Sequence, residues 1–555
     1  MMDDVLISNL PSELLRSALR VLVSQGAVTQ QPFVQHIRHR MLEAPPATPS
    51  PDALFPEIYE ASTTCKQYLA LTRCVFSCKL AKECLPYLIH FLDSIRLANA
   101  RWTSGSELGA VLATFDGDIV QAVQALKESR PEPTQELEEL LMKLFISIKE
   151  CYKYCETTET PYPFLRSERQ VKDVLGILFL GQSQLSGSEG ICSAKLIVEV
   201  SKETKVETFK LGQYQVPRLF NGLWQLSSPA WGSGTAEKQE AALLSLVKCG
   251  LTTADMADHY GDAELVYGDF RNKLPAQVKN KTYAATKWCV FGPINRPVTS
   301  DWVLDAVKDR CRRLGGRVEL LQFHWHDYEA KQYLDVLVEL VSITKSHPEL
   351  VSTIGLCNFD SDHVEEACEY LLSKIGAVGI VTNQVQFSLL DSRPLQLMCA
   401  VCTKYDLKLL TYGSFCGGFL SEKWLNQPAP EVYSETSQLT PSQRKYFDMI
   451  NKWGTWADFQ ALLDVLYSVA RKHGVSLTNI ATRWVLQQPA VGAVIVGTRL
   501  GVSAHGDENL RVFDLILDED DMNSINRIAV DKDGEKTKEM FSKLGDCGNE
   551  YRAMH

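Results

Sequence analysis

Four ionisable side chains stand near the ends of short apolar segments, and their types would allow proton transfer. The segment ADMADHYGDAE (254–264) contains Asp255 and Tyr260. Later segments end in Lys287 and His324. A tyrosine phenol holds its proton at neutral pH, and a lysine ammonium beside it favours the phenolate. An aspartate offsets the cost of burying the lysine charge, and a histidine can orient a carbonyl oxygen. Together they would protonate a forming oxyanion, with hydride from an external donor.

These residues require a scaffold that brings several strand ends together. From about residue 205, β-rich segments alternate with amphipathic helical segments. The predicted strands are 219–227, 252–260, 281–289, 318–325, 351–359, 379–387, 407–415 and 491–498. Eight alternations over this length are typical of an α/β protein with a (β/α)8 TIM barrel, whose chemistry lies at the C-terminal strand ends. A doubly wound sheet is the alternative, but no G-x-G-x-x-G turn follows the first strand.

Amide and aromatic side chains at the later strand ends predict a nucleotide site. Asn358 and Gln384 offer amide groups that match a carboxamide, and Tyr412 offers an aromatic face for a nicotinamide ring. The segment 494–510 follows the eighth strand, and such barrels commonly bind phosphate through the loops after strands seven and eight. A nicotinamide nucleotide is therefore the predicted hydride donor.

Residues 205–530 resemble an aldo-keto reductase. The matching segments, in chain order, are GLTTADMADHYGDAE, AATK, LLQFHW, IGLCNF, TNQVQF, LLTYGSFCGGFL and VGTRLGVSAHGDENLRVFDL. The resemblance implies NADPH-dependent reduction of an aldehyde or ketone, or the reverse oxidation of an alcohol. It also implies that Tyr260 donates the proton, that Lys287 and Asp255 tune it, and that His324 orients the substrate.

The resemblance also implies a set of cofactor-binding residues, namely Asn358, Gln384, Tyr412, Thr498, Arg499, Glu508 and Asn509. The sequence departs from the family pattern in four places, and two of these departures concern the cofactor. Cys357 replaces the usual serine before the carboxamide-binding asparagine, which removes a hydroxyl contact, and His505 stands where a second arginine is common. Because Arg499 keeps a cation for the 2′-phosphate, NADPH is expected in preference to NADH.

Three further residues are candidates for the substrate pocket: Trp224, His259 and Trp325. They accompany the first, second and fourth predicted strands, so a pocket with aromatic walls is expected. The shape of that pocket, and with it the identity of the carbonyl substrate, does not follow from the sequence.

The remaining acids of 254–264 are expected to have no chemical role. Asp258 and Asp262 are predicted to be solvent-facing loop residues, and Glu264 is expected to serve structure. A metal site is not expected, because Asp255 and Asp258 would face opposite sides of an extended segment whereas a metal needs converging ligands.

The first third of the chain has a different texture. Residues 1–195 show helical periodicity, as in LPSELLRSALRVLVSQG, where Pro11 marks a helix start and Gly26 a stop. They are predicted to form a mainly α-helical N-terminal domain of unassigned role, with a surface that could bind a protein partner. The barrel would then span 205–530, and 531–555 would form a C-terminal tail.

The composition favours a small molecule or a protein as partner. The net charge is -11 and lysines and arginines are scattered, so nucleic acid and anionic membranes are poor candidates. Apolar runs fall short of the ~20 residues of a membrane span, and the N-terminus carries acids where a signal peptide carries positive charge. The sixteen cysteines lack paired zinc-binding spacing. A cytoplasmic protein with reduced thiols is expected.

Two functions remain open at this point. In the first, the chain is a working NADPH-dependent oxidoreductase. In the second, the barrel binds nucleotide but is catalytically weak, and it serves as a sensor or scaffold whose N-terminal domain binds a partner. The four intact ionisable groups favour the first.

Overall fold

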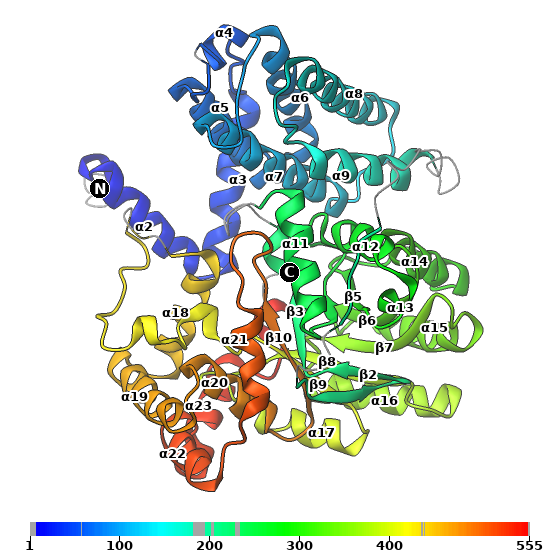
Figure 1. Ribbon diagram of the computed structural model, residues 1–555, viewed down its shortest axis with the longest axis vertical. Helices are drawn as coiled ribbons and strands as arrows, with labels where there is room; N and C mark the ends of the chain where they lie inside the picture. Colours follow the sequence, from blue (N-terminus) through cyan, green and yellow to red (C-terminus); the bar gives the residue numbers. More distant parts are fainter. Residues whose placement is uncertain are drawn as a thin grey trace.

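The C-terminal part of the chain folds around a closed barrel of eight parallel strands. The computed structural model describes residues 7–56, 58–180, 195–200, 205–227, 234–434, 437 and 439–552, and its barrel has the strand order β10-β3-β4-β5-β6-β7-β8-β9 (Figure 1). The strands are β3 (Leu219–Gly222), β4 (Thr253–Asp255), β5 (Tyr283–Val290), β6 (Val318–Trp325), β7 (Val351–Cys357), β8 (Ile380–Gln386), β9 (Lys408–Tyr412) and β10 (Val491–Gly497). Each overlaps one predicted strand, so the predicted (β/α)8 barrel is confirmed.

The segment after β4 leaves the sheet earlier than predicted. The strand ends at Asp255, although the β-rich pattern continues to Tyr260. The Tyr260 N–H donates to the Ala257 carbonyl at 3.1 Å, and Gly261 has a φ of +58°, which only glycine adopts at little cost. Tyr260 therefore lies in a tight turn at the C-terminal end of the barrel, not in a strand.

Helices surround the barrel and bury their apolar faces against it. They are α11 (Ala236–Lys248), α12 (Ala263–Lys273), α13 (Ala276–Lys279), α14 (Ser300–Arg313), α15 (Gln332–Ser346), α16 (Ser361–Ile375), α17 (Met398–Lys404), α18 (Pro441–Trp453), α19 (Trp456–His473), α20 (Leu477–Leu486), α21 (Gly506–Leu510), α22 (Glu519–Ala529), α23 (Glu535–Leu544) and α24 (Asn549–Arg552). Several start at side chains that cap the first backbone N–H groups, such as Thr235, Thr299 and Ser476. A short 3-10 helix, η3 (Trp224–Ser227), follows β3.

A small hairpin closes the opposite end of the barrel. Strands β1 (Thr208–Leu211) and β2 (Tyr214–Pro217) pair antiparallel, and Leu211 and Val216 pack on Phe220 and Leu320 inside the barrel. These four-residue strands are too short to give a clear periodicity, and the sequence did not predict them. With this end filled, the candidate residues gather at the other end.

The N-terminal helices have a hydrophobic core of their own. They are α2 (Ser12–Ser24), α3 (Ala27–Glu43), α4 (Pro51–Leu54), α5 (Thr63–Ser77), α6 (Ala81–Leu97), α7 (Glu107–Glu128), α8 (Gln135–Thr158) and α9 (Leu165–Leu175). Their buried apolar residues, from Leu54 to Leu175, form one cluster that is distinct from the main barrel cluster. We call the helices α4 to α9 the helical region.

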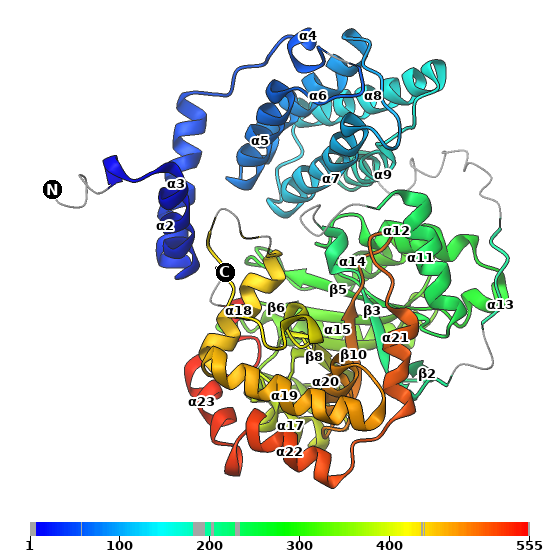
Figure 2. The ribbon, with the colours of Figure 1, turned by 60° about the vertical axis from the view of Figure 1, so that its left-hand side comes forward.

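The helical region lies against the end of the barrel that carries the candidate residues. Helix α7 contacts η3 and helix α9 contacts α12, and Figure 2 shows α7 and α9 facing the barrel helices α12 and α14. The α2–α3 hairpin extends to one side, where Arg20 of α2 donates to the Tyr433 carbonyl at 3.3 Å. The helical region therefore contacts both the segment after β3 and the barrel helix α12.

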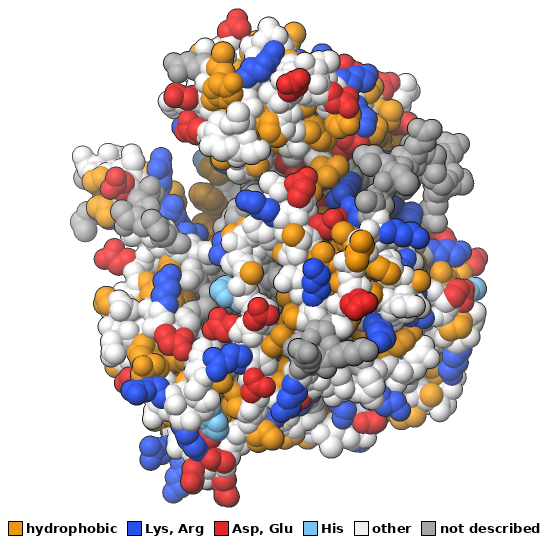
Figure 3. Space-filling view, viewed as in Figure 1, with side chains coloured by type: hydrophobic (Ala, Val, Ile, Leu, Met, Phe, Trp, Pro, Cys, Tyr) orange, Lys and Arg blue, Asp and Glu red, His pale blue; other side chains and the backbone are white. Residues whose placement is uncertain are grey.

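Two features bear on the partners of the protein: the hydropathy of its described helices and the charge on the face shown in Figure 3. Among the described residues, no helix is both long and apolar enough to cross a membrane. In the space-filling view, basic and acidic side chains are interspersed over the helical region and the barrel (Figure 3). On that face the scattered charge expected from the sequence is preserved.

Candidate active site

Asp255 is the centre of a buried hydrogen-bond network inside the barrel. Its Oδ2 accepts from Lys287 Nζ at 2.6 Å, and its Oδ1 accepts from Gln322 Nε2 at 2.9 Å and Gln384 Nε2 at 2.8 Å. All four side chains are buried. Gln322 was not a predicted site residue, although strand periodicity in LLQFHW puts it on the same face as His324.

Lys287 carries a buried positive charge next to the turn that contains Tyr260. Besides Asp255, it donates to the Met256 carbonyl at 2.8 Å. Burial by itself favours the neutral amine, but Asp255, together with the nearby Tyr260 and Cys357, outweighs it and holds the pKa of Lys287 above its ordinary value. The ammonium form therefore persists across neutral pH.

Tyr260 lies beside this charge. The Nζ atom of Lys287 is 4.8 Å from the centroid of the tyrosine ring. Burial raises the pKa of Tyr260 above its ordinary value, and the Lys287 charge opposes that rise without cancelling it. The lysine thus acts in the expected direction but is outweighed by burial, and Tyr260 is a protonated phenol at neutral pH.

His324 comes from β6, two residues beyond Gln322 and on the same face of the strand. Its Nδ1 lies 3.8 Å from the Cys289 Sγ, and its Nε2 lies 3.4 Å from the Asn358 Nδ2. The Phe291 ring packs edge-on against the imidazole at a centroid distance of 5.2 Å. The barrel therefore places His324 at the same end as Asp255.

The three residues predicted to bind a carboxamide and a nicotinamide ring lie on adjacent strand ends. Tyr412 donates its hydroxyl hydrogen to Asn358 Oδ1 at 2.8 Å, and the Asn358 N–H donates to the Gln384 carbonyl at 2.8 Å. Asn358 has a φ of +57°, a left-handed conformation that asparagine tolerates. The second of these hydrogen bonds joins backbone groups, whereas the side-chain amides of Asn358 and Gln384 carry the donor and acceptor groups that pair with a carboxamide. Their chemistry therefore fits a nicotinamide.

The C-terminal tail reaches the same place. The Tyr551 ring lies 6.4 Å from the His324 ring and 6.2 Å from the Tyr412 ring. Arg552 donates to the Asn358 carbonyl at 2.9 Å. The tail therefore forms one wall of the site. Its position depends on tertiary packing, for which the local sequence carries no signal.

The residues predicted to bind the nucleotide phosphates lie in the loop and helix after β10. The Thr498 N–H donates to the Gly222 carbonyl at 2.9 Å, while Arg499 and Glu508 are exposed. The Asn509 N–H donates to the His505 carbonyl at 2.9 Å in the first turn of α21. An exposed cation beside accessible loop backbone has the chemistry to hold a phosphate.

Two of the three predicted pocket residues stand near the active-site loops. Trp224 is 39% exposed in η3, and the His259 ring lies 4.7 Å from the Tyr260 ring. Trp325 instead is 0% exposed and stacks on Phe323 at 5.9 Å. Because side chains alternate along β6 and His324 faces inward, Trp325 faces the surrounding helices. It is a core residue, and its assignment to the pocket is corrected.

The prediction that Asp258 and Asp262 face solvent is wrong. The Asp258 carboxylate contacts the Arg310 guanidinium and accepts the Cys289 N–H at 3.2 Å. Asp262 is 0% exposed and pairs with Arg166 at 2.6 Å. Each partner comes from an element distant in sequence, so the local pattern could not reveal it.

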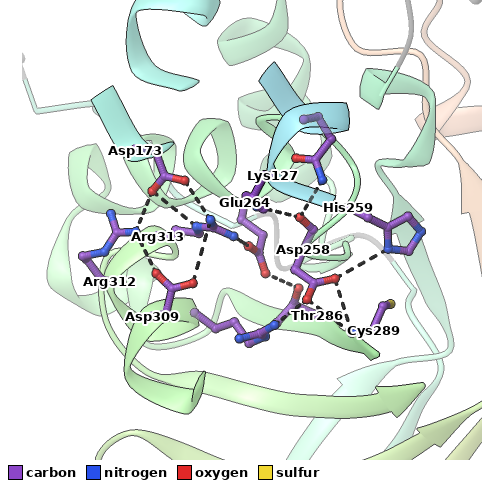
Figure 4. A network of polar contacts seen from close by, with 12 residues as sticks. Lys127, Asp173, Asp258, His259, Glu264, Thr286, Cys289, Asp309, Arg312 and Arg313 are labelled. Atoms are coloured by element: carbon purple, nitrogen blue, oxygen red, sulfur yellow. Dashed lines mark hydrogen bonds and ion pairs between the residues drawn. The ribbon is translucent and has the colours of Figure 1, made fainter. Parts of the chain in front are cut away.

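Glu264 has the structural role expected of it. It accepts the Thr286 hydroxyl at 2.5 Å and pairs with Arg313 at 3.1 Å. Figure 4 shows Arg313 between Glu264 and Asp173, so the ion pairs continue from the barrel into the helical region.

One group of potential metal ligands occurs in the described part of the chain. Ligand atoms of Asp258, His259 and Cys289 lie within 4.8 Å of one another. Yet Arg310 already neutralises Asp258, and burial with the nearby Asp258 charge raises the pKa of the Cys289 thiol well above its ordinary value. Since the thiolate is the form that binds metals, we assign no metal to this group.

The chain is similar in sequence to several known proteins. The chain is 32% identical over 181 residues to flagellar radial spoke protein 5 of Chlamydomonas reinhardtii, a match that covers 30% of this chain and only 33% of that protein. It is 26% identical over 308 residues to 6-dehydroglucose reductase of Novosphingobium aromaticivorans, which covers 52% of this chain and 85% of the relative. It is 20% identical over 337 residues to the NADH-specific methylglyoxal reductase of Escherichia coli, which covers 56% and 94%.

The family assignment rests on the barrel as a whole. Residues 218–530, more than half of the chain, match the sequence model of the Aldo/keto reductase family. This range contains all eight barrel strands and the cluster of Asp255, Tyr260, Lys287 and His324. The chain belongs to the aldo/keto reductase family.

Proposed function

We propose that the protein is an NADPH-dependent oxidoreductase that reduces an aldehyde or ketone to an alcohol, or catalyses the reverse oxidation. The observation that carries this proposal is the half-buried Tyr260 beside the buried Lys287–Asp255 ion pair, with 2.6 Å between charged atoms. A bound nicotinamide supplies the hydride. Tyr260 then supplies the proton to the carbonyl oxygen.

The residues around Tyr260 divide the work of proton transfer. Burial keeps the phenol protonated before the reaction. As the proton leaves, negative charge develops on the phenolate oxygen, and the Lys287 ammonium stabilises that charge more strongly than it does the neutral phenol. Asp255 holds the ammonium in place, and His324 orients the carbonyl by hydrogen bonding.

The cofactor is proposed to lie across the ends of β7 to β10. Asn358 and Gln384 would bind the carboxamide, and Tyr412 would stack on the nicotinamide ring. At the rim, Thr498, Arg499, Glu508 and Asn509 would hold the adenosine phosphate end. The preference for NADPH over NADH rests on the Arg499 cation, and a relative named as NADH-specific makes that preference worth testing.

The substrate is proposed to be a small carbonyl compound that contacts Trp224 and His259. We place the protein in the cytoplasm, with neither nucleic acid nor membrane as a partner. The surface of the helical region that faces away from the barrel is available for a protein partner.

The proposal is tested by NADPH consumption with a panel of aldehydes and ketones. Tyr260→Phe removes the proton donor and keeps the ring, so kcat should fall by about 100- to 10,000-fold with little change in NADPH affinity. If the wild type bound NADPH tightly but turned over nothing in the panel, and the variant behaved identically, the sensor or scaffold function would be correct instead.

A further inference from the structure

The turn that carries Tyr260 is held at both ends by the helical region. Lys127 of α7 donates from Nζ to the Asp258 carbonyl at 3.0 Å. Arg166 of α9 donates from Nε to Asp262 Oδ2 at 2.9 Å and from Nη2 to Asp262 Oδ1 at 2.6 Å. Tyr260 thus lies two residues from each anchor, and Figure 4 shows Lys127 reaching the Asp258 carbonyl.

The Arg166 contact has the geometry of a rigid support. A guanidinium that binds a carboxylate through two parallel hydrogen bonds fixes both distance and orientation, which a lysine ammonium does not. The side chain of Arg166 is 9% exposed and that of Asp262 is 0% exposed. Solvent therefore screens this pair little, and it constrains the turn strongly.

Arg166 also joins this turn to a second active-site loop. Its Nη2 donates to the Leu226 carbonyl at 2.8 Å, in the short helix η3 that begins with Trp224. One side chain of the helical region therefore fixes the loop of the proton donor relative to a loop of the proposed pocket.

A parallel chain of ion pairs leads from α9 to the strand that carries Lys287. Asp173 pairs with Arg313 at 2.7 Å, and Arg313 pairs with Glu264 at 3.1 Å. Glu264 accepts the hydroxyl of Thr286, the residue before Lys287. The helical region thus contacts both sides of the Tyr260–Lys287 pair through buried polar groups.

The barrel supplies only part of the support for this turn. Its Arg310 contacts the Asp258 carboxylate, and its Lys287 carbonyl accepts the Asp258 N–H at 3.3 Å. The Asp258 carbonyl instead accepts from Gln124 and Lys127 of α7, and the Asp262 carboxylate accepts from Arg166 of α9. We propose that the helical region is a working part of the enzyme, in which Arg166 and Lys127 are positioning residues for the proton donor Tyr260. This inference rests on the proposed function and adds a role for α7 and α9.

The direct test is Arg166→Met in the full chain, assayed with NADPH and benzaldehyde or the best aldehyde of the panel. A displacement of the reacting group by about 1 Å costs about 100-fold in rate. We therefore expect kcat to fall by about 100-fold, with the Kd of NADPH changed less than about twofold. Arg166→Lys keeps the charge but loses the two-pronged contact, so its kcat should lie between those of the wild type and Arg166→Met.

Arg73→Met is the matched control. Arg73 also belongs to the helical region and pairs at 2.8 Å with a nearly completely buried aspartate, Asp118, but that partner lies within the same region. If the helical region only stabilised the protein, the two variants would lower kcat alike. We expect Arg73→Met to keep wild-type kcat at a temperature where both proteins are folded.

Lys127→Met gives a second test in case Arg166→Met does not fold. It removes one contact to a backbone carbonyl, and kcat should fall by about tenfold without loss of NADPH binding. Hydrogen–deuterium exchange of residues 256–264 provides a readout that does not depend on turnover, and exchange should rise in both variants but not in Arg73→Met.

The outcomes separate this inference from the proposed function. If the wild type turns over but Arg166→Met and Lys127→Met keep its kcat and its exchange at 256–264, the positioning role is overturned while the reductase function stands. If the wild type shows no turnover, the proposed function fails, and unchanged exchange in the variants would overturn the support by the helical region as well.

Discussion

The barrel and the helical region both bury charged side chains, but they direct them differently. In the barrel, Asp255 and Lys287 come from neighbouring strands and meet inside their own domain. In the helical region, Arg166 and Asp173 leave their own core and bind partners on the barrel. The Asp255–Lys287 pair of the barrel belongs to the proposed chemical site, whereas Arg166 and Asp173 of the helical region are proposed to hold that site in shape.

This difference explains why the site residues of the barrel are predictable from the sequence, whereas the supporting residues of the helical region are not. A parallel barrel brings all its strand ends to one face, so polar residues at successive strand ends must lie near one another. A helical region has no such rule, because the faces of its helices that meet another domain depend on tertiary packing. Supporting residues supplied by a second domain therefore escape a search based on strand ends.

The largest expected effect on stability comes from Asp173→Asn, which breaks the ion pair between Asp173 of the helical region and Arg313 of the barrel. Loss of one partner leaves the buried Arg313 guanidinium short of an opposite charge, and breaking such a pair costs about 3–5 kcal/mol. The free energy of unfolding, measured in urea, should fall by about that amount, and exchange should rise in the barrel turn 256–264 as well as in α9.

Asp118→Asn provides the control for that experiment. Asp118 is buried and pairs with Arg73 inside the helical region. It should lower stability without raising exchange in the barrel turn. Equal exchange at 256–264 in the two variants would show that the helical region supports the barrel through its overall stability and not through the interface pairs.

A smaller effect is expected from acid, because Arg312 and Arg313, which pair with Asp173 of the helical region, also hold Asp309 of their own helix. Burial favours the neutral form of Asp309, but Arg313, Arg310 and Arg312 outweigh it and lower the pKa of Asp309 to about 2. A depressed folded-state pKa gives stability that is present above the ordinary value of about 4 and is lost as the pH falls through about 2. The contribution is about 2 kcal/mol.

Urea unfolding of the wild type and of Asp309→Asn measures this contribution. The stability difference between the two proteins should be full at about pH 6 and should shrink as the pH falls toward about 2. A difference that stays constant over this range would show that the Asp309 carboxylate is not held ionised by the three arginines, and the interface would then owe little to their charge.

Particular residues show which features of the fold and the site could be predicted from the sequence. The eight strands were predictable because each is a β-rich segment between amphipathic helices, and the order of the motifs placed Asp255 and Lys287 on adjacent strands. Gln322 was missed although period-two spacing put it beside His324. Asp262 was misassigned to solvent, because its partner Arg166 comes from a distant part of the chain. Trp325 was misassigned to the pocket although the same alternation along β6 puts it on the face opposite His324.

The smallest expected effect lies at the rim of the barrel, where the exposed Arg499 is proposed to bind the cofactor. Arg499→Ala should weaken NADPH binding by about tenfold, the value of about one charge-assisted hydrogen bond, and should change NADH binding much less. Since Arg499 is exposed, the urea midpoint should stay within experimental error of the wild type. Binding of the two nucleotides can be followed by tryptophan fluorescence. Equal weakening of NADPH and NADH would show that Arg499 does not contact the 2′-phosphate, and a lowered midpoint would show that it supports the fold, as Arg166 is proposed to do.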